Sequence, residues 1–249
     1  MASSRLACAL VGVAVALAAL CAIALPLAGL GHRWGWWGYR AGFVILKWAV
    51  YAAVLAAALG LAAAVLGLTG RAWAMTLGGV AAMAIAGAAL WVPVSMLRAA
   101  RSVPAIHDIT TDTENPPVFV AVLARRRDAA NPAEYAGAPI AARQRAAYPD
   151  LVPVELALPP GRALAGAAAA ARALGWEIVA EAPAEGRLEA TDTTPWWGFK
   201  DDVVVRVTPS GPGSRVDVRS LSRVGVSDLG ANARRIRRFL TELRARAGG

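Results

Sequence analysis

Three long apolar runs near the N-terminus constrain this chain more than any other feature of its sequence. They span residues 6–30, 43–68 and 72–97, and each exceeds the ~20 residues that an α-helix needs to cross the hydrocarbon core of a bilayer. If the chain were soluble, three helices that are apolar on all sides would need far more covering chain than 249 residues supply. We therefore expect three transmembrane helices in residues 1–97.

The residues at the ends of these runs agree with a membrane location. The segment HRWGWWGY at 32–39 is typical of an aromatic belt at the membrane–water interface. Lys47 lies about a turn inside the second run, from where its side chain can reach the interface. The first run could instead be a signal peptide, and Ala22 and Ala24 leave cleavage open, but its apolar stretch exceeds the ~7–15 residues usual for such a peptide.

Charge divides the chain at about residue 97. Residues 1–97 contain five basic residues and no acidic one, whereas the remainder contains 21 basic residues and all 17 acidic ones. Nucleic-acid binding would require basic residues gathered in one stripe with stacking aromatic side chains. Since the second half has a near-balanced charge, we expect no nucleic-acid partner.

The residues beyond the third run predict a linker with an extended motif at 98–117 and an α+β domain at 118–249. Alternating apolar residues at 203–208 and 216–219, joined by the turn at 210–214, indicate two half-buried strands. Further strands are expected at 118–123, 151–158, 176–181 and 187–191, of which 151–158 is an edge strand because of Pro153. The polar stretch at 124–150 is interpreted mostly as loop. Sequential hairpins of this kind form an antiparallel sheet.

Two helices are expected to pack on one face of this sheet. The first is the alanine-rich stretch 161–174. The second follows Ser227 or Asp228, either of which can cap it. Its apolar positions recur at three- and four-residue spacing, while arginines, Arg235 among them, occupy the other faces; the apolar positions are Leu229, Ala233, Ile236, Leu240 and Leu243.

Three motifs of the second half, taken together, resemble the DUF1499 family, a bacterial and plastid group of unknown function. They are PAIHDITTDTENPP at 104–117, GRLEATDTTPWWGFKDDVVVRV at 186–207 and VDVRSLSRVGVSDLGANARRIRRFL at 216–240. The resemblance implies no active site, because the family has none established. Some members resemble this chain in having membrane helices, while others have a signal peptide or lipid anchor. The resemblance therefore suggests a domain outside the cytoplasm.

The first motif contains the candidates for catalysis. His107 with Asp108 or Asp112 could act as a base, and with Glu114 these residues could ligate a divalent metal. A metal site usually needs three or four protein ligands, and His107 is the only histidine of the second half. We favour a loop whose Asp and Asn side chains bind their own backbone, and we expect no metal and no cofactor.

The later motifs contain candidates for ligand or partner binding. The segment that joins the last strand to the last helix could receive an anion through Ser222 and Arg223, although a capping Asp228 would satisfy the same amides. Asp201 and Asp202 should point to opposite faces of a strand, and one could pair with Arg187 or Arg219 rather than act in catalysis. Two adjacent rings cannot both enter a single-layer core, so one could contact the bilayer or a partner; the full binding set is Trp196, Trp197, Arg219, Ser222 and Arg223.

Three functions remain open from the sequence. The leading hypothesis is a multi-pass membrane protein whose domain binds a ligand or partner near the bilayer surface without catalysis. The alternatives are a membrane-tethered hydrolase that uses His107 with Asp108 or Asp112, and an assembly subunit of a membrane complex. No catalytic motif such as Gly-x-Ser-x-Gly or a phosphate-binding loop is found.

The side of the membrane on which the domain lies is predicted by two arguments that conflict. With three spans, Arg33, Arg40, Arg98 and Arg101 share the side of the domain, which favours the cytoplasm by the positive-inside rule. The family resemblance and Arg5 at the N-terminus favour the opposite side. We expect the bacterial inner (cell) membrane and an extracytoplasmic domain in the cell envelope.

Overall fold

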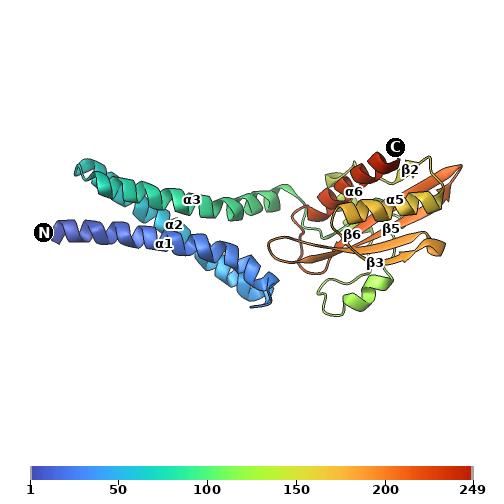
Figure 1. Cartoon of the computed structure of the whole chain (residues 1–249), viewed down its shortest axis with the longest axis horizontal. Coiled ribbons are helices and arrows are strands. Elements are labelled where there is room, and N and C mark those ends of the chain that lie inside the picture. Colours follow the sequence, from blue (N-terminus) through green and yellow to red (C-terminus); the bar gives the residue numbers. More distant parts are fainter. Residues whose placement is uncertain (1, 248–249) are drawn as a thin grey trace. The chain divides into compact units, whose positions relative to one another are not determined.

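The structure is a computed structural model that describes residues 2–247, with side chains from residue 7 onward within that range. The chain divides into two compact units, each described by itself. The first comprises residues Met1–Arg98 together with Pro195–Gly198, and the second comprises Ala99–Thr194 and Phe199–Gly249. Figure 1 shows the long helices of the first unit in blue to green and the longer strands of the second in orange to orange-red.

Three long helices form most of the first unit: α1 (Ala2–Arg33), α2 (Tyr39–Thr69) and α3 (Trp73–Ser102). Stretches of 27, 31 and 30 residues in them have mean hydropathies of 2.8, 2.3 and 2.0 in their most apolar windows. By length and composition, all three helices can cross a membrane. The three expected helices are thereby confirmed.

Small residues let these helices approach closely. Alanines of all three helices are fully buried in one cluster, which consists of Ala14, Ala18, Ala56, Ala82 and Ala86. A Cβ added to Gly79 of α3 would lie 2.4 Å from the carbonyl oxygen of Gly60 in α2. The contact between α2 and α3 therefore depends on glycine, as is usual where membrane helices pack through their backbones.

The second unit is built on a six-stranded antiparallel sheet in the order β1-β6-β5-β4-β3, and β2 also pairs with β6. The hairpin of β5 and β6 turns through two residues after Ser210, and Gly211 has φ 52°, a value that glycine adopts most readily. The expected antiparallel sheet is confirmed. Its strands are β1 (Asp108–Thr110), β2 (Val154–Leu156), β3 (Glu177–Ala182), β4 (Arg187–Thr193), β5 (Lys200–Ser210) and β6 (Gly213–Ser222).

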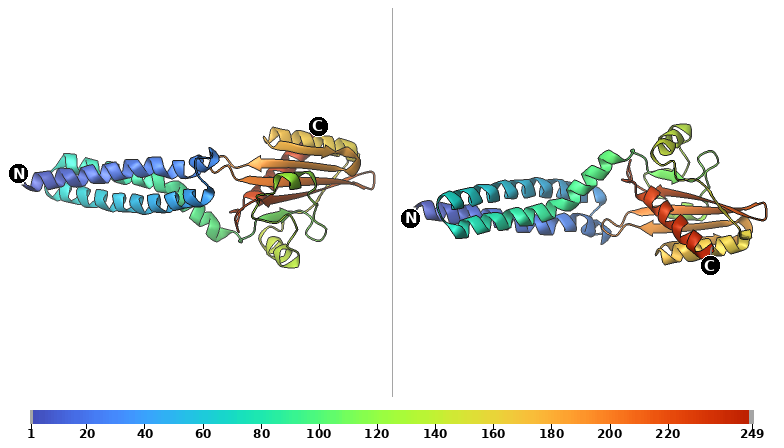
Figure 2. Two further views of the ribbon diagram at one scale, coloured as in Figure 1. Left: turned by 90° about the horizontal axis from the view of Figure 1, so that it is seen from below. Right: turned by 90° about the horizontal axis from the view of Figure 1, so that it is seen from above.

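Two helices, α5 (Pro160–Ala173) and α6 (Ala231–Ala247), pack on one face of the sheet (Figure 2). Alternate strand residues such as Val203 and Val205 point into this core because strand side chains alternate between faces. Trp176 stacks on Phe239 with ring centroids 5.2 Å apart. The expected α+β class, with helices on one face of an antiparallel sheet, is confirmed.

The opposite face is covered by residues 117–135, here named the covering segment. Its Phe119 and Val122 pack on Val204 and Leu221 of the sheet. The strand expected at 118–123 is wrong, because the chain forms a 3₁₀ helix, η1 (Ala121–Arg125), over part of that stretch. The Glu189 carboxylate accepts the backbone amides of Val120, Ala121 and Val122, which a strand would have offered to a neighbouring strand.

A short helix, α4 (Ala138–Ala147), lies where a loop was expected. Its first turn tolerates Pro139, since the amide of a first-turn residue has no partner within the helix. Buried Gln144 donates to the Thr110 carbonyl at 2.5 Å and accepts the Thr110 amide at 3.0 Å. The side chain thus occupies the free edge of β1 in place of another strand.

The last helix differs from its prediction at two points. It starts at Ala231 rather than near Leu229, which has φ 53° and is not helical. Arg235, expected on an exposed face, is 3% exposed. Its guanidinium is buried because Asp192 and Asp201 of the sheet accept its hydrogen bonds at 2.7 and 2.5 Å.

Candidate functional site

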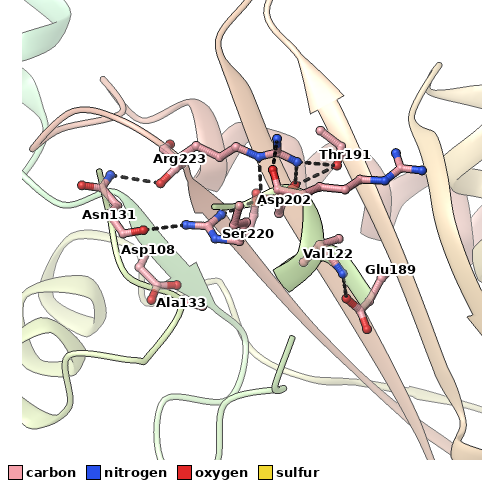
Figure 3. Close-up of polar contacts among 12 residues, drawn as sticks. Asp108, Val122, Asn131, Ala133, Glu189, Thr191, Asp202, Ser220 and Arg223 are labelled. Carbon is pink, nitrogen blue, oxygen red and sulfur yellow. Dashed lines mark hydrogen bonds and ion pairs between the residues drawn. The ribbon is translucent and has the colours of Figure 1, made fainter. Parts of the chain in front are cut away.

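The polar side chains of the three sequence motifs meet around the sheet of the second unit, and Figure 3 shows several of them. On the edge strand β1, Asp108 accepts two hydrogen bonds from Arg219 of β6, at 3.0 and 2.8 Å. Both side chains are buried. A bidentate pair of this kind fixes the orientation of the guanidinium as well as its position.

Arg219 also holds both ends of the covering segment. It donates to the carbonyl oxygens of Pro117 at 3.2 Å and Ala133 at 2.7 Å. Its guanidinium carbon lies 4.9 Å from the ring centroid of Phe119 and 5.5 Å from that of Tyr135, within the range of cation–π attraction. Burial, together with the nearby Asp108 charge, raises the pKa of Tyr135 to about 12.

Asp202 of β5 is the centre of a second cluster, beneath the middle of the covering segment. It accepts hydrogen bonds from Arg126 at 2.5 Å, Arg223 at 2.8 and 2.9 Å and the Thr191 hydroxyl at 2.7 Å. Burial of the Asp202 carboxyl acts to raise its pKa, but the hydrogen bonds from Arg223, Thr191 and Arg126 outweigh burial, and the pKa is lowered. The carboxylate therefore stays ionised with its oxygens fully engaged.

Glu189 of β4 anchors the start of η1. Besides the three backbone amides of residues 120–122, it pairs with Arg187, which also pairs with Glu185 at 2.8 Å. The Glu189 side chain is completely buried. Together with the Arg219 and Asp202 clusters, it fixes the covering segment to the sheet at three points.

The face under α6 has its own polar cluster. Asp201 and Asp202 lie on opposite faces, as strand alternation predicts, and Asp201 pairs with Arg235 of α6 at 2.5 Å. Asn232 of α6 accepts from Ser220 at 2.7 Å and donates to Ser222 at 3.0 Å. A salt bridge was expected for one of these aspartates, and both have one. Asp202 pairs with Arg126 and Arg223, and Asp201 pairs with Arg235, so neither uses the expected Arg187 or Arg219.

The catalytic candidates of the first motif are not brought together. Nδ1 of His107 lies 3.5 Å from the Val226 carbonyl, whereas Asp108 faces Arg219 on the other side of the strand. Asp112 pairs with Arg206 and Arg215 at 3.1 and 3.0 Å. It also accepts the amides of Glu114 and Asn115, which is the backbone-binding loop that the sequence favoured.

The binding candidates lie in two places. Arg219, Ser222 and Arg223 are on β6 or directly after it, and each has partners within the second unit. Asp228 accepts the amides of Gly230 and Asn232 at 2.8 and 2.7 Å, so it caps α6 as expected. Burial is the main cause that raises the pKa of Asp228.

Trp196 and Trp197 belong to the first unit by their contacts. The Trp196 indole donates to the Pro26 carbonyl of α1 at 2.9 Å. A Cβ on Gly29 would lie 2.6 Å from the Trp196 Nε1, and one on Gly42 would lie 2.8 Å from the Trp197 ring. Two glycines of α1 and α2 therefore leave the space that these rings occupy.

Several residues of these clusters were missed from the sequence. Arg126 and Asn131 lie in a polar stretch that resembles any solvated loop, and Glu189 stands in an ordinary alternating strand. One signal was available for Glu189, because strand alternation places it on the same face as Thr191 and opposite to Leu188 and Ala190. Among the described residues, no group of three His, Cys, Asp or Glu side chains could hold a metal ion.

Comparison with known families places most of the second unit in a described family. A family profile described as "Protein of unknown function (DUF1499)" matches residues 108–243, which is more than half of the chain and spans β1 to α6. No curated protein matches the chain.

Proposed function

Because this chain belongs to the DUF1499 family of proteins of unknown function, we propose its role from its own surface: it is a membrane-anchored module whose second unit binds a protein partner without catalysis. The observation that supports this proposal is a row of exposed apolar side chains on the covering segment. Val118, Val120 and Leu123 are 69%, 52% and 45% exposed. This row is here named the apolar ridge.

The ridge is rigidly held although it is exposed. Phe119 and Val122, which alternate with the ridge residues, are buried against the sheet. Glu189 fixes the backbone of the ridge through three amides, and Arg219 fixes Pro117 before it. An apolar surface on a rigid backbone loses little conformational entropy on binding, and the exposed Arg125–Glu177 ion pair gives the neighbouring surface the polar character of an interface rim.

The same geometry gives less support to a hydrolase. A general base needs access to a substrate and a pKa near the working pH, whereas Asp108 is bound by Arg219, and Asp112 by two arginines. A stably produced His107→Ala protein with an unchanged cellular phenotype would count against the hydrolase. A His107→Ala protein that is present at normal abundance but no longer supports the cellular function would instead favour the hydrolase.

Cross-linking in living cells tests the ridge. A photoreactive amino acid replaces Val120 in the full chain, and a matched control replaces Val152, which is equally exposed at 52% but lies outside the ridge. We expect an adduct with a protein partner from position 120 and none from position 152. The paired change Val118→Asp and Leu123→Asp should abolish that adduct. Equal adducts from both positions, or an adduct that survives the paired change, would contradict the proposal.

We further propose that the second unit lies outside the cytoplasm, at the bacterial inner membrane. Arg5 at the N-terminal end, as well as the exported relatives that the family resemblance suggests, support this orientation. Alkaline phosphatase and green fluorescent protein, each fused in turn after Gly249, test it. Phosphatase activity without fluorescence is expected, and the reverse result would put the domain in the cytoplasm.

A further inference from the structure

A cavity of about 570 Å³ lies within the first unit, between α1 and α3. Its wall includes Ala22 and Pro26 of α1, Ala89 and Pro93 of α3, and Trp196. The volume falls within the ~300–1,000 Å³ of sites that bind small molecules. Since all of its lining residues belong to the first unit, the cavity is a feature of that unit alone.

The two prolines account for the position of the cavity. Each lies inside a helix, where proline removes the amide that would bind the carbonyl four residues earlier. Those carbonyls belong to Ala22 and Ala89, which also line the cavity. The cavity therefore lies where each helix lacks one of its regular backbone hydrogen bonds. It is a feature of the backbone and does not depend on the rotamer of one side chain.

Trp196, which lines the cavity together with α1 and α3, is also held in a fixed position. The Trp196 indole donates to the Pro26 carbonyl at 2.9 Å and lies directly over Gly29, where any side chain would collide with it. The ring can therefore neither rotate freely nor move into the cavity without the loss of that hydrogen bond.

The chemistry of the wall and its surroundings identifies the occupant. The lining side chains are apolar apart from the engaged Trp196 indole, and both helices can cross a membrane. Val92 in the wall is 44% exposed, so an apolar chain can enter from outside the helices. Left empty, a cavity of this size would deprive its wall of dispersion contacts.

The apolar wall, and not a charge, selects the occupant. Exposed Arg98 follows Pro93 by five residues, which places it about 140° further round α3 and away from the wall. We propose that the cavity binds one acyl chain of a membrane phospholipid. This inference rests on the proposed function only in that the first unit is embedded in a bilayer.

Native mass spectrometry of the full chain tests the proposal. The protein is reconstituted into vesicles of phosphatidylcholine and phosphatidylglycerol in equal parts, extracted in mild detergent, and examined for retained lipid. We expect one retained phospholipid per chain, without a strong preference for either headgroup. Arg98→Gln, a change on the face of α3 away from the wall, should leave this retention unchanged.

Matched variants fill the cavity or leave it open. Ala89→Phe places a ring in the cavity and should reduce lipid retention at least about tenfold, whereas Ala84→Phe makes the same change at an exposed position of α3 outside the wall and should retain it. Ala22→Phe repeats the test from α1, so that misfolding of one variant does not decide the result. Each variant must also resist extraction from membranes by carbonate.

Two results would overturn the inference. The first is a wild-type chain that retains no phospholipid, and the second is a pair of Ala89→Phe and Ala22→Phe chains that both retain it. If the wild-type chain resists carbonate but retains no lipid, only the lipid site fails. If carbonate extracts the wild-type chain, the membrane anchoring in the proposed function fails with it.

Discussion

The two faces of the sheet in the second unit are held by different interactions. Beneath α5 and α6, alternate strand residues such as Val205 and Val218 pack on helix residues such as Ile236 in one large apolar core. On the opposite face, the apolar cluster around Phe119 is small, and buried charges hold the covering segment. Apolar packing tolerates gradual changes in shape, whereas a buried ion pair becomes strongly destabilising when one partner is removed.

This difference suggests what the sequence motifs do. Asp108, Asp202 and Arg219 have the residue types of an active site, but each is bound to partners that come from distant parts of the chain. Their geometry fixes the covering segment, and with it the apolar ridge. The comparison therefore predicts that changes to the charges act locally on one face, while changes to the apolar core act on the whole unit.

The largest effect is expected from Asp202→Ala. It leaves the guanidiniums of Arg126 and Arg223 beneath the covering segment without their carboxylate, which should destabilise that segment by about 3–5 kcal/mol. Hydrogen exchange of the full chain, followed by mass spectrometry, should show faster exchange in peptides from 117–135 than in α6. Asp150→Ala is the control, because its pair with Arg237 is about half exposed and should matter by no more than ~1 kcal/mol. A uniform increase across the unit would show that the two faces are not independent.

On the other face, Leu240→Ala should destabilise the whole second unit by about 2–5 kcal/mol. Leu240 is 4% exposed in the core beneath α6, and its truncation leaves a cavity. Arg238→Ala changes an exposed residue of the same helix and should alter stability by less than ~0.5 kcal/mol. The same exchange measurement should now show faster exchange in α6 and in the covering segment together. Equal effects of the two substitutions would contradict the assignment of the buried helix face.

The apolar face could be predicted from the sequence far better than the charged one. Strand alternation at 203–207 and the spacing of Ala233, Ile236, Leu240 and Leu243 are local patterns, and the structure keeps them. The contacts of Glu189 with residues 120–122 join segments 67 to 69 residues apart, and no local pattern marks such a pair. For the same reason, Arg235 was assigned to solvent, because only the fold brings Asp192 and Asp201 to it.

Lowering the pH should destabilise the two faces of the sheet to different extents in the unchanged protein. The pKa of Asp202 is lowered in the folded chain, so its ionisation stabilises the fold above the ordinary aspartate pKa of ~3.9, and this stability is lost as pH falls through the folded value. Asp228 has a raised pKa, so its contribution is fully present below the ordinary value and is lost as pH rises through the folded one. Pulsed hydrogen exchange after incubation at decreasing pH should show the covering segment opening before the first turn of α6. Asp202→Asn should weaken this pH dependence, and simultaneous opening of both regions in the unchanged protein would count against it.

The smallest effect is expected at Tyr135, and it tests how Arg219 is held. Among the described residues, the buried Tyr135 hydroxyl has no hydrogen-bond partner. Because Tyr135→Phe removes a buried polar group without a partner, it should change the free energy of unfolding by less than ~0.5 kcal/mol or raise it slightly. The ring of phenylalanine keeps its cation–π contact with Arg219, whereas Tyr135→Leu removes it and should cost about 0.5–1 kcal/mol more. Exchange of the peptide around Ala133, whose carbonyl accepts from Arg219, provides the measurement. If Tyr135→Phe instead accelerated that exchange as much as Tyr135→Leu, the hydroxyl rather than the ring would be the group that stabilises the end of the covering segment.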